Sequence, residues 1–236
     1  MRPLFALLFS CAVLSAAQTS VTLLTPAEHA VVQRQSADSG RVEVNGQAPG
    51  DGVGVEIRCD GGSWQPLKTF PVEGKPSTLG FAATLDLSKG LHTLEARAAR
   101  GDKPLGDPTV VHFGIGEVFV VTGQSNSANH GAVKTKAASD QVFTLTPQGT
   151  WQPCTDPQPG ASGGGGSILP ALGDELQKRL GVPIGFIPCG IGATSVREWL
   201  PTGITFPNPP TILSRVRKTA DGQWESDGKA YAMLVK

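Results

Sequence analysis

The stretch GEVFVVTGQSNS, residues 116–127, decides how the chain is divided and which fold follows. Its first half, EVFVV at residues 117–121, is a nearly uninterrupted run of apolar and β-branched residues. Such runs are typical of parallel strands covered on both faces, whereas half-exposed strands alternate apolar and polar residues. The run stops at a glycine, and polar residues follow. We therefore expect an α/β layer to begin after Gly116, with a ligand-binding edge where this strand ends.

The next residues contain a helix and further strands in the order of a parallel α/β layer. Residues 167–183 predict a helix that Ser167 caps at its start and Gly181 at its end. Four leucines fall on one face of it, at spacings of three and four: Leu169, Leu172, Leu176 and Leu180. IGFIPCG, residues 184–190, predicts the following strand, and QVFTLT, residues 141–146, is a candidate for a third.

The number of strands is lower than a complete doubly wound sheet requires. Two convincing parallel strands and one candidate compare with roughly five in that fold. The last segment, GKAYAMLVK at residues 228–236, has the pattern of an element that is only beginning. We therefore expect residues 116–236 to form an incomplete, flavodoxin-like α/β domain, and the chain to be a fragment of a longer protein.

Upstream, residues 18–115 show a different pattern, of short alternating strands. Apolar side chains recur at every second position in GVGVEIR, residues 52–58, and in FAATLDL, residues 81–87. Clusters of Gly, Pro, Asp and Ser separate the strands, and no segment with a helical period intervenes. This pattern predicts an antiparallel β-sandwich of immunoglobulin-like type, so we expect two domains.

The first residues predict a secretory signal peptide, residues 1–17. Arg2 supplies the positive start, an apolar run extends to Leu14, and small residues lead to cleavage after Ala17. The run is shorter than the roughly 20 residues that a membrane-spanning helix needs, so we expect no membrane span. The protein is expected to be exported, either secreted or periplasmic.

Charge and cysteine content narrow the classes of partner. The chain has 20 basic and 20 acidic side chains, which argues against nucleic acid or an anionic membrane, since both require a basic excess. Cys59, Cys154 and Cys189 contain no CxxC pair, and the four histidines show no ligand spacing, so no metal is expected. A bridge between Cys154 and Cys189 and buried free thiols are both open alternatives.

Ser125 stands two residues after the glycine that follows the first α/β strand. Its hydroxyl is expected at the carboxyl edge of the sheet. If a helix begins there, its free N–H groups and positive dipole end would stabilise an anion developing on an ester carbonyl. The alternative is that Ser125 or Asn126 only caps the helix. The GxSxG elbow of α/β-hydrolases is not matched, because Ser127 stands in place of its second glycine.

A second strand also ends in glycines, within IPCGIGATSVREW at residues 187–199. Gly190 and Gly192 can approach a substrate closely and offer an N–H group, although an ordinary βα turn would have the same sequence. Two such loops at one sheet edge would face a common crevice. Arg197 and Trp199 could line a sugar pocket there or be a surface charge and a core residue, with neither alternative favoured. GASGGGGS, residues 160–167, predicts a flexible loop, since a phosphate loop would need a following lysine.

Together the two motifs resemble the SGNH (GDSL-like) hydrolases, and among them the sialate O-acetylesterase branch and carbohydrate esterase family six. TGQSNS, residues 122–127, is similar to the nucleophile block of that branch, usually GQSNM, with Ser127 in place of methionine. GIGATSVREW, residues 190–199, looks like its second block, usually GGTS followed by a tryptophan, with Ala193 in place of a glycine. The resemblance covers roughly residues 117–200.

The resemblance implies a serine esterase that removes O-acetyl groups from carbohydrates and needs no cofactor. Ser125 would attack the acetyl carbonyl, and the N–H groups of Ser125 and Gly192 would hold the oxyanion. Gln124, Asn126 and Arg197 are expected to contact the substrate. The implied partner is an acetylated saccharide; neither the sugar nor the oligomeric state is specified by the sequence.

The chain departs from this family at the catalytic base, which there comes from a late Asp-x-x-His motif. No Asp-x-x-His occurs in the sequence. GQWESDG, residues 222–228, lacks the His-Gln-Gly of the family's third block, and His130 is expected to point away from Ser125. A serine without a base is a poor nucleophile, so the chain as given is expected to be inactive. The alternative function is that of a non-catalytic exported protein that binds a glycan or another protein.

Overall fold

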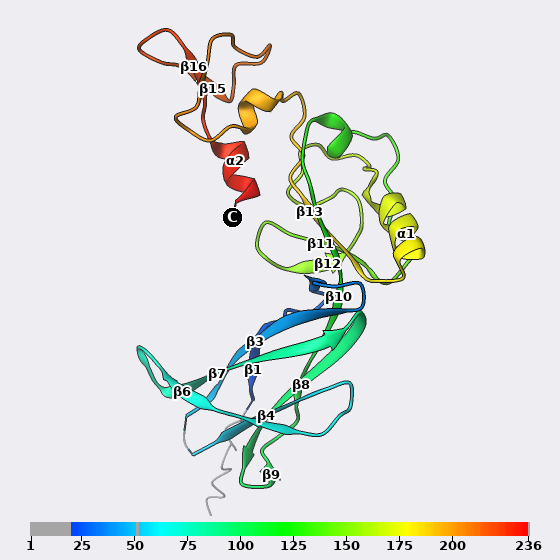
Figure 1. Ribbon diagram of the computed structural model, residues 1–236, viewed down its shortest axis with the longest axis vertical. Coiled ribbons are helices and arrows are strands. Elements are labelled where there is room, and N and C mark those ends of the chain that lie inside the picture. Colours follow the sequence, from blue (N-terminus) through cyan, green and yellow to red (C-terminus); the bar gives the residue numbers. More distant parts are fainter. Residues whose placement is uncertain (1–19, 51, 236) are drawn as a thin grey trace, which may run out of the picture.

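The computed structural model describes residues 20–50 and 52–235. The expected signal peptide, residues 1–17, lies outside the described residues. Figure 1 shows three parts stacked along the long axis: the N-terminal strands, a mixed sheet with one helix, and a small three-stranded sheet. None of the helices in the described part of the chain is long and apolar enough to cross a lipid bilayer.

The N-terminal part, residues 20–115, is called the sandwich here because two sheets face each other in it. The first sheet has the order β1 (Thr22–Thr25), β3 (Ser39–Pro49), β7 (Lys75–Ser88) and β6 (Thr69–Val72). The second belongs to a nine-stranded sheet that continues beyond residue 115 into the next part of the chain. Its path is β12 (Trp151–Pro153), β11 (Val142–Leu145), β13 (Ile184–Pro188), β10 (Thr109–Val121), β8 (Gly90–Arg100), β4 (Gly54–Cys59) and β5 (Gln65–Leu67), with β2 (Val31–Gln33) paired to β10 and β9 (Lys103–Pro104) paired to β8.

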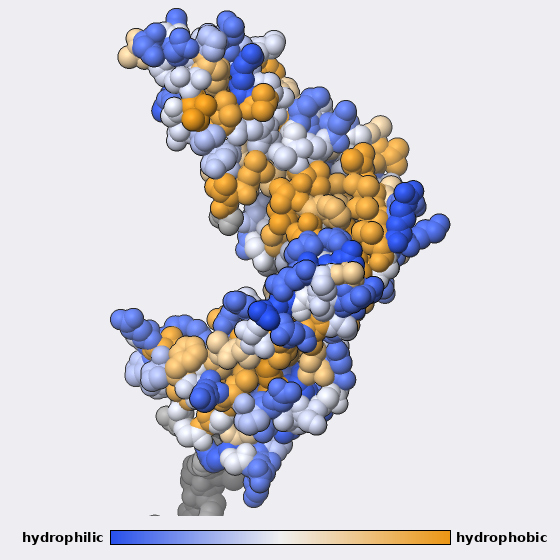
Figure 2. Space-filling model, in the orientation of Figure 1, coloured by the Kyte–Doolittle hydropathy of each residue, from blue (hydrophilic) through white to orange (hydrophobic). Residues whose placement is uncertain are grey.

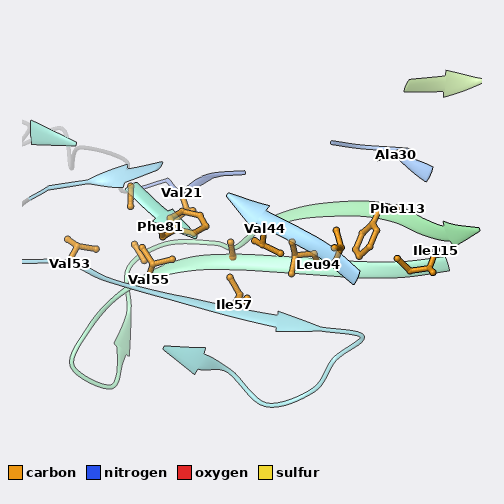
Figure 3. Packing of buried hydrophobic residues seen from close by; sticks show 14 residues of the cluster. Val21, Ala30, Val44, Val53, Val55, Ile57, Phe81, Leu94, Phe113 and Ile115 are labelled. Atoms are coloured by element: carbon orange, nitrogen blue, oxygen red, sulfur yellow. The ribbon is translucent and has the colours of Figure 1, made fainter. Parts of the chain in front are cut away.

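Alternating side chains from both sheets form the sandwich core (Figure 3). Val44 of β3 and Phe81 of β7 meet Val55, Leu94 and Phe113 of the facing strands, and each is at most 1% exposed. This confirms the expected antiparallel N-terminal sheet. One pairing departs from the expectation, because β2 runs parallel to β10. The immunoglobulin-like topology stays a prediction.

One continuous strand, β10, belongs to both the sandwich and the part that follows. Its first half, residues 109–115, pairs antiparallel with β8, and its second half, residues 117–121, pairs parallel with β13. The sequence predicted two separate strands here and a domain boundary between residues 115 and 116. That boundary falls inside a strand. Across it, Arg34 Nε of the sandwich donates to Glu117 Oε1 at 2.7 Å, which ties the two parts together.

The α/β part, residues 116–200, contains the expected parallel strands. The order is β11–β13–β10, with QVFTLT providing β11, and β12 is added antiparallel to β11. The run 117–121 is not buried on both faces as expected. Phe119 and Val121 pack against the core beneath α1 (Leu169–Leu180), whereas Val120 on the opposite face is 52% exposed. Within the described residues, a long helix covers one face of this sheet.

Helix α1 ends at Gly181 as the sequence predicts, but its N-cap residue is Ile168 rather than the expected Ser167. Ser167 Oγ accepts the Leu169 N–H at 3.1 Å, and Gly181 ends the helix in a left-handed conformation with φ of 65°. Its buried face differs from the prediction. Leu172 and Leu180 are 38% and 37% exposed, because the helix packs through Leu169, Gly173 and Leu176 instead. Figure 2 shows hydrophobic residues gathered on the surface of the α/β part.

The C-terminal residues, 201–235, form a part that the sequence did not predict. Its sheet has the order β14 (Thr205–Phe206), β16 (Trp224–Ser226) and β15 (Val216–Lys218), and α2 (Lys229–Leu234) follows. Ser226 Oγ donates to the carbonyl oxygen of Glu198 at 2.8 Å, which attaches this sheet to the α/β part. The GQWESDG segment lies in this sheet, in β16 and the turns beside it.

All three cysteines in the described part of the chain are free thiols. Cys154 is buried and donates to Gln158 Oε1 at 3.6 Å, and Cys189 is buried beside the carbonyl oxygen of Met233. Of the two alternatives left open by the sequence, the structure therefore has free thiols rather than a bridge.

Candidate active site

Ser125 lies just beyond the carboxyl end of β10, as expected. The chain leaves the strand through Gly123, with φ of 128°, and forms a single 3₁₀ turn, η1 (Ser125–Ser127). The helix that begins at Ser125 is only this three-residue 3₁₀ turn, so no helix dipole of useful length points at the hydroxyl. Ser125 Oγ instead donates to Gln124 Oε1 at 2.7 Å. The side chain is half-buried at the protein surface.

The second glycine loop packs directly against this turn. The Ile191 N–H donates to the carbonyl oxygen of Gly123 at 2.9 Å. A Cβ at Gly190 would lie 2.2 Å from the carbonyl oxygen of Ser127, so only glycine permits this approach. The two motifs are far apart in sequence and are side by side in space, because β10 and β13 are neighbouring parallel strands.

Residues 160–166 lie next to these two loops and are held by backbone hydrogen bonds rather than free as expected. Gly165 N and Gly166 N donate to the carbonyl oxygens of Asn129 and Gly131, each at 2.9 Å. This arrangement brings Ser162 to the second loop. Gly192 N, the expected oxyanion donor, donates to Ser162 Oγ at 2.6 Å. Ser162 could not be singled out from the sequence, where it is only a serine in a glycine-rich run.

His130 lies in the same region as Ser125 but does not bond to it. A cavity of about 400 Å³ is lined by Ser125, Asn126 and His130, among others. His130 Nε2 is 3.4 Å from Ser162 Oγ, and its ring lies against Gly192. Within the described ranges, no histidine is hydrogen-bonded to Ser125. His130 therefore belongs to the Gly192 side of the site.

A second cavity, of about 380 Å³, is lined by residues of the loop after β10 and of the second motif. Gln124 lines it from the loop, and Thr194 and Trp199 line it from the second motif. Trp199 Nε1 donates to Thr194 Oγ1 at 3.0 Å, which fixes the indole at the cavity wall. Of the two alternatives for Trp199, the structure favours the cavity-lining one.

Arg197 is separate from this cavity. It belongs to a second 3₁₀ turn, η2 (Val196–Trp199), and its guanidinium lies 6.0 Å from the ring centroid of Phe206 in the C-terminal sheet. Ser195 and buried Glu198 hold the turn in a capping box, with Ser195 Oγ donating to Glu198 Oε2 at 2.5 Å. The catalytic and substrate-binding roles assigned to Gln124, Ser125, Asn126, Gly192 and Arg197 stay predictions.

Ala193 adopts a left-handed conformation, with φ of 60°, at the position where the resembling block has a glycine. A Cβ in this region of backbone space costs roughly 1 kcal/mol. We expect Ala193→Gly to raise the free energy of unfolding by about 0.5–1 kcal/mol in urea denaturation. Exposed Ala132, whose backbone is not left-handed, provides the control: Ala132→Gly should not stabilise the protein.

Asp156 is a buried carboxylate that organises the loops behind the site and that the sequence did not single out. It is 8% exposed. It accepts hydrogen bonds from Thr135 N at 3.1 Å, Gln158 Nε2 at 3.0 Å, Ser167 N at 3.0 Å and Ser167 Oγ at 2.6 Å. Burial alone raises the pKa of Asp156, but the bonds from Ser167, Gln158 and Thr135 outweigh it and lower that pKa below its usual value.

We expect Asp156→Asn to lower the free energy of unfolding by about 1–3 kcal/mol at neutral pH, since an amide nitrogen would face backbone donors. Because the folded-state pKa is below the unfolded value of about 3.9, this stabilisation is present above pH 4 and is lost as pH falls through the folded pKa. The difference in the free energy of unfolding between the unmodified protein and Asp156→Asn should therefore become smaller in acid. Asp140→Asn is the control, because exposed Asp140 accepts no hydrogen bond from any described residue. A constant gap from pH 7 to pH 3 would contradict this role.

The third segment considered from the sequence, GQWESDG, has its polar side chains engaged in structure. Glu225 accepts from Arg217 Nε at 2.6 Å and from Gly203 N at 3.1 Å. One group of Cys, His and Asp side chains with metal-binding spacing exists among the described residues, and it lies in the sandwich rather than at this site.

Comparison with known proteins finds a matching family model and two solved structures with partial similarity. The family model for carbohydrate esterase, sialic acid-specific acetylesterase, matches residues 115–234. A solved carbohydrate acetylesterase from Xanthomonas citri is 17% identical, with a TM-score of 0.42 over 78% of this chain and 42% of that one. A protein from Arabidopsis thaliana is 20% identical, with a TM-score of 0.31 over 36% of this chain and 44% of that one. The chain thus spans less than half the length of either structure. No curated protein matches it.

Proposed function

Because this chain belongs to the sialic acid-specific acetylesterase family of carbohydrate esterases, we propose that its protein hydrolyses O-acetyl esters of saccharides with Ser125 as the nucleophile. The observation that carries the proposal is the packing of the two motif loops. Ile191 N bonds to Gly123 and Gly190 lies against Ser127, so Ser125 and the second loop share one edge of the sheet.

The proposed reaction is acyl transfer through serine. Ser125 Oγ attacks the acetyl carbonyl carbon, the bond to the sugar oxygen breaks, and a base moves the hydroxyl proton to that oxygen. Water then hydrolyses the acetyl-serine and releases acetate. Gln124 Oε1 accepts a hydrogen bond from Ser125 Oγ, with 2.7 Å between the two oxygens, and so orients the hydroxyl before reaction.

Gly192 N–H is the proposed second oxyanion donor, beside the N–H of Ser125. Ser162 Oγ accepts the Gly192 N–H at 2.6 Å, which is the bond that a substrate oxyanion would accept. Ser162 Oγ therefore occupies the position proposed for the carbonyl oxygen of the substrate's acetyl group, and it has to move when the acetyl group binds. The sequence at the N-terminus supports the further proposal that the protein is exported, and so meets acetylated saccharides outside the cytoplasm.

The full-length protein should release acetate from O-acetylated sialic acid or acetylated xylan and react with a fluorophosphonate probe. Mass spectrometry of the labelled protein should place the adduct on the peptide that contains Ser125. Labelling of a different serine, with acetate release intact, would contradict the assignment of the nucleophile.

A second candidate function, a non-catalytic saccharide-binding protein, is favoured by one observation. No histidine among the described residues is hydrogen-bonded to Ser125, so the nucleophile has no base in this part of the protein. If the full-length protein binds acetylated saccharides in calorimetry but releases no acetate, this second function replaces the first.

A further inference from the structure

One cluster of side chains in the sandwich takes no part in the esterase motifs. Cys59 ends β4, Asp60 follows it, and His92 lies on the neighbouring strand β8. One ligand atom from each of the three lies within 4.8 Å of the others. The His92 side chain is 5% exposed and that of Asp60 is 50% exposed. Because two paired strands carry the cluster, the fold fixes its spacing.

Each ring nitrogen of His92 has an oxygen atom at hydrogen-bond distance. Its Nε2 lies 2.8 Å from the carbonyl oxygen of Ser88, which has no proton to give, so Nε2 carries the hydrogen. In the neutral imidazole Nδ1 then presents its lone pair, and it lies 2.8 Å from Asp60 Oδ2. The Nδ1 lone pair of His92 and the carboxylate oxygen of Asp60 repel each other unless a proton or a metal ion lies between them. A metal ion would require the two atoms to move slightly apart.

The atoms around the cluster have the arrangement found behind metal ligands. Metal-bound histidines donate their second N–H to a backbone carbonyl or a carboxylate, as His92 does to Ser88. Thr93 N donates to Asp60 Oδ1 at 2.8 Å, which orients the carboxylate and leaves Oδ2 toward His92. His92 is therefore held by its hydrogen bond to Ser88 and Asp60 by its hydrogen bond from Thr93, and both bonds could remain when a metal is bound.

We propose that Cys59 Sγ, an Asp60 carboxylate oxygen and His92 Nδ1 bind a divalent transition-metal ion of the Zn²⁺ type. Sulfur, nitrogen and oxygen ligands together suit Zn²⁺ rather than Ca²⁺ or Mg²⁺. Three protein ligands leave a fourth position, which water can reach past the half-exposed Asp60. The sequence concealed this site because Cys59 and His92 are far apart in the chain and belong to different strands.

Metal binding here has to displace a thiol proton. Burial, together with the negative charge of Asp60, raises the pKa of Cys59 to about 12. On binding, the metal–sulfur bond forms, the S–H bond breaks, and the proton passes to solvent. Without metal, a proton between His92 Nδ1 and Asp60 Oδ2 would form a hydrogen bond that joins them. The experiment must distinguish this protonated pair from a bound metal ion.

The test uses Co²⁺ as a spectroscopic substitute for Zn²⁺, with the full-length protein kept reduced. One equivalent of Co²⁺ should produce a sulfur-to-cobalt charge-transfer band in the near ultraviolet, and Zn²⁺ should remove it by competition. Cys59→Ser should abolish the band. Cys154→Ser is the matched control, since Cys154 is a buried thiol outside the cluster, and its band should match that of the unmodified protein.

Asp60→Asn separates metal binding from folding. The amide NH₂ can donate to the His92 Nδ1 lone pair while Asn Oδ1 still accepts from Thr93 N, so the strands should remain in place. Affinity for Co²⁺ should fall at least about 10-fold, because an amide is a much poorer ligand than a carboxylate. No charge-transfer band in the unmodified protein, a band that persists in Cys59→Ser, or equal affinity in Asp60→Asn would each overturn the proposal.

Discussion

Replacing Ser125 by alanine is expected to lower kcat for acetyl ester hydrolysis by the full-length protein at least about 10⁴-fold. The alanine side chain cannot form the acetyl-serine intermediate, so only transition-state binding by the surrounding N–H groups would remain. The loop itself should stay folded. Among the described residues, Ser125 Oγ makes one hydrogen bond, to the side chain of the adjacent Gln124, and none to another element. Acetate release from an O-acetylated sugar is the measurement.

Ser127→Ala is the matched control for this prediction. Ser127 is in the same 3₁₀ turn, and its Oγ donates to the carbonyl oxygen of Gln124 at 2.8 Å. Its loss should cost about 1 kcal/mol of stability and leave most of the activity. If both variants lost activity equally, the effect would come from the loop conformation, and Ser125 would lose its assigned role.

Gly116→Ala is expected to lower the free energy of unfolding by about 3 kcal/mol, the largest change expected in stability. A Cβ there would lie 1.9 Å from the carbonyl oxygen of Pro183 and 2.8 Å from its carbonyl carbon. These are backbone atoms, and Pro183 O also accepts the Glu117 N–H at 3.0 Å, so the neighbouring strand cannot yield without loss of pairing. Urea denaturation followed by circular dichroism measures the effect.

Gly54→Ala provides the comparison for Gly116. Gly54 is also in a strand, β4, but a Cβ there would lie 3.6 Å from the nearest atom, the carbonyl oxygen of Ala99, which is ordinary van der Waals contact. Its stability should change by less than about 0.5 kcal/mol. Equal effects at the two positions would mean that strand propensity, rather than the contact with Pro183, decides the outcome.

The sequence predicted those parts of the fold that depend on local pattern. The C-terminal limit of α1 followed from Gly181, because capping is a property of adjacent residues, and the start lies one residue beyond the cap predicted at Ser167. Which leucines are buried did not follow. A narrow sheet lies beneath the helix, and its contacts with Leu169 and Gly173 set the rotation of α1. Periodicity identifies an apolar face but not the partner that covers it.

The joining of two predicted strands into β10 also escaped the sequence, for a physical reason. Gly114 and Gly116 interrupt the apolar pattern and so indicate a break. In the structure they are present because Pro183 approaches the strand closely at both positions. A glycine that permits contact and a glycine that ends a strand have the same appearance in a sequence.

The candidate site was predictable where each motif follows its own strand, and not where distant segments meet. Ser125 and Gly192 follow β10 and β13, so parallel pairing places them at one edge. Ser162 reaches Gly192 from a loop 30 residues earlier, and Asp156 holds Ser167 and Thr135 across the fold. No spacing rule connects these residues, because their contacts depend on how whole loops pack.

The unbroken course of β10 has a mechanical consequence. A flexible linker between two units lets them move relative to each other. A strand paired on both sides of Gly116 is rigid, because bending it would break its hydrogen bonds with β8 and β13. The pairing of β10 with both β8 and β13 therefore holds the sandwich in a fixed position relative to the strand that leads to Ser125. A protease or a gene fusion that separates residue 115 from residue 116 would divide β10. Each half would then have an unprotected sheet edge where the strand had continued.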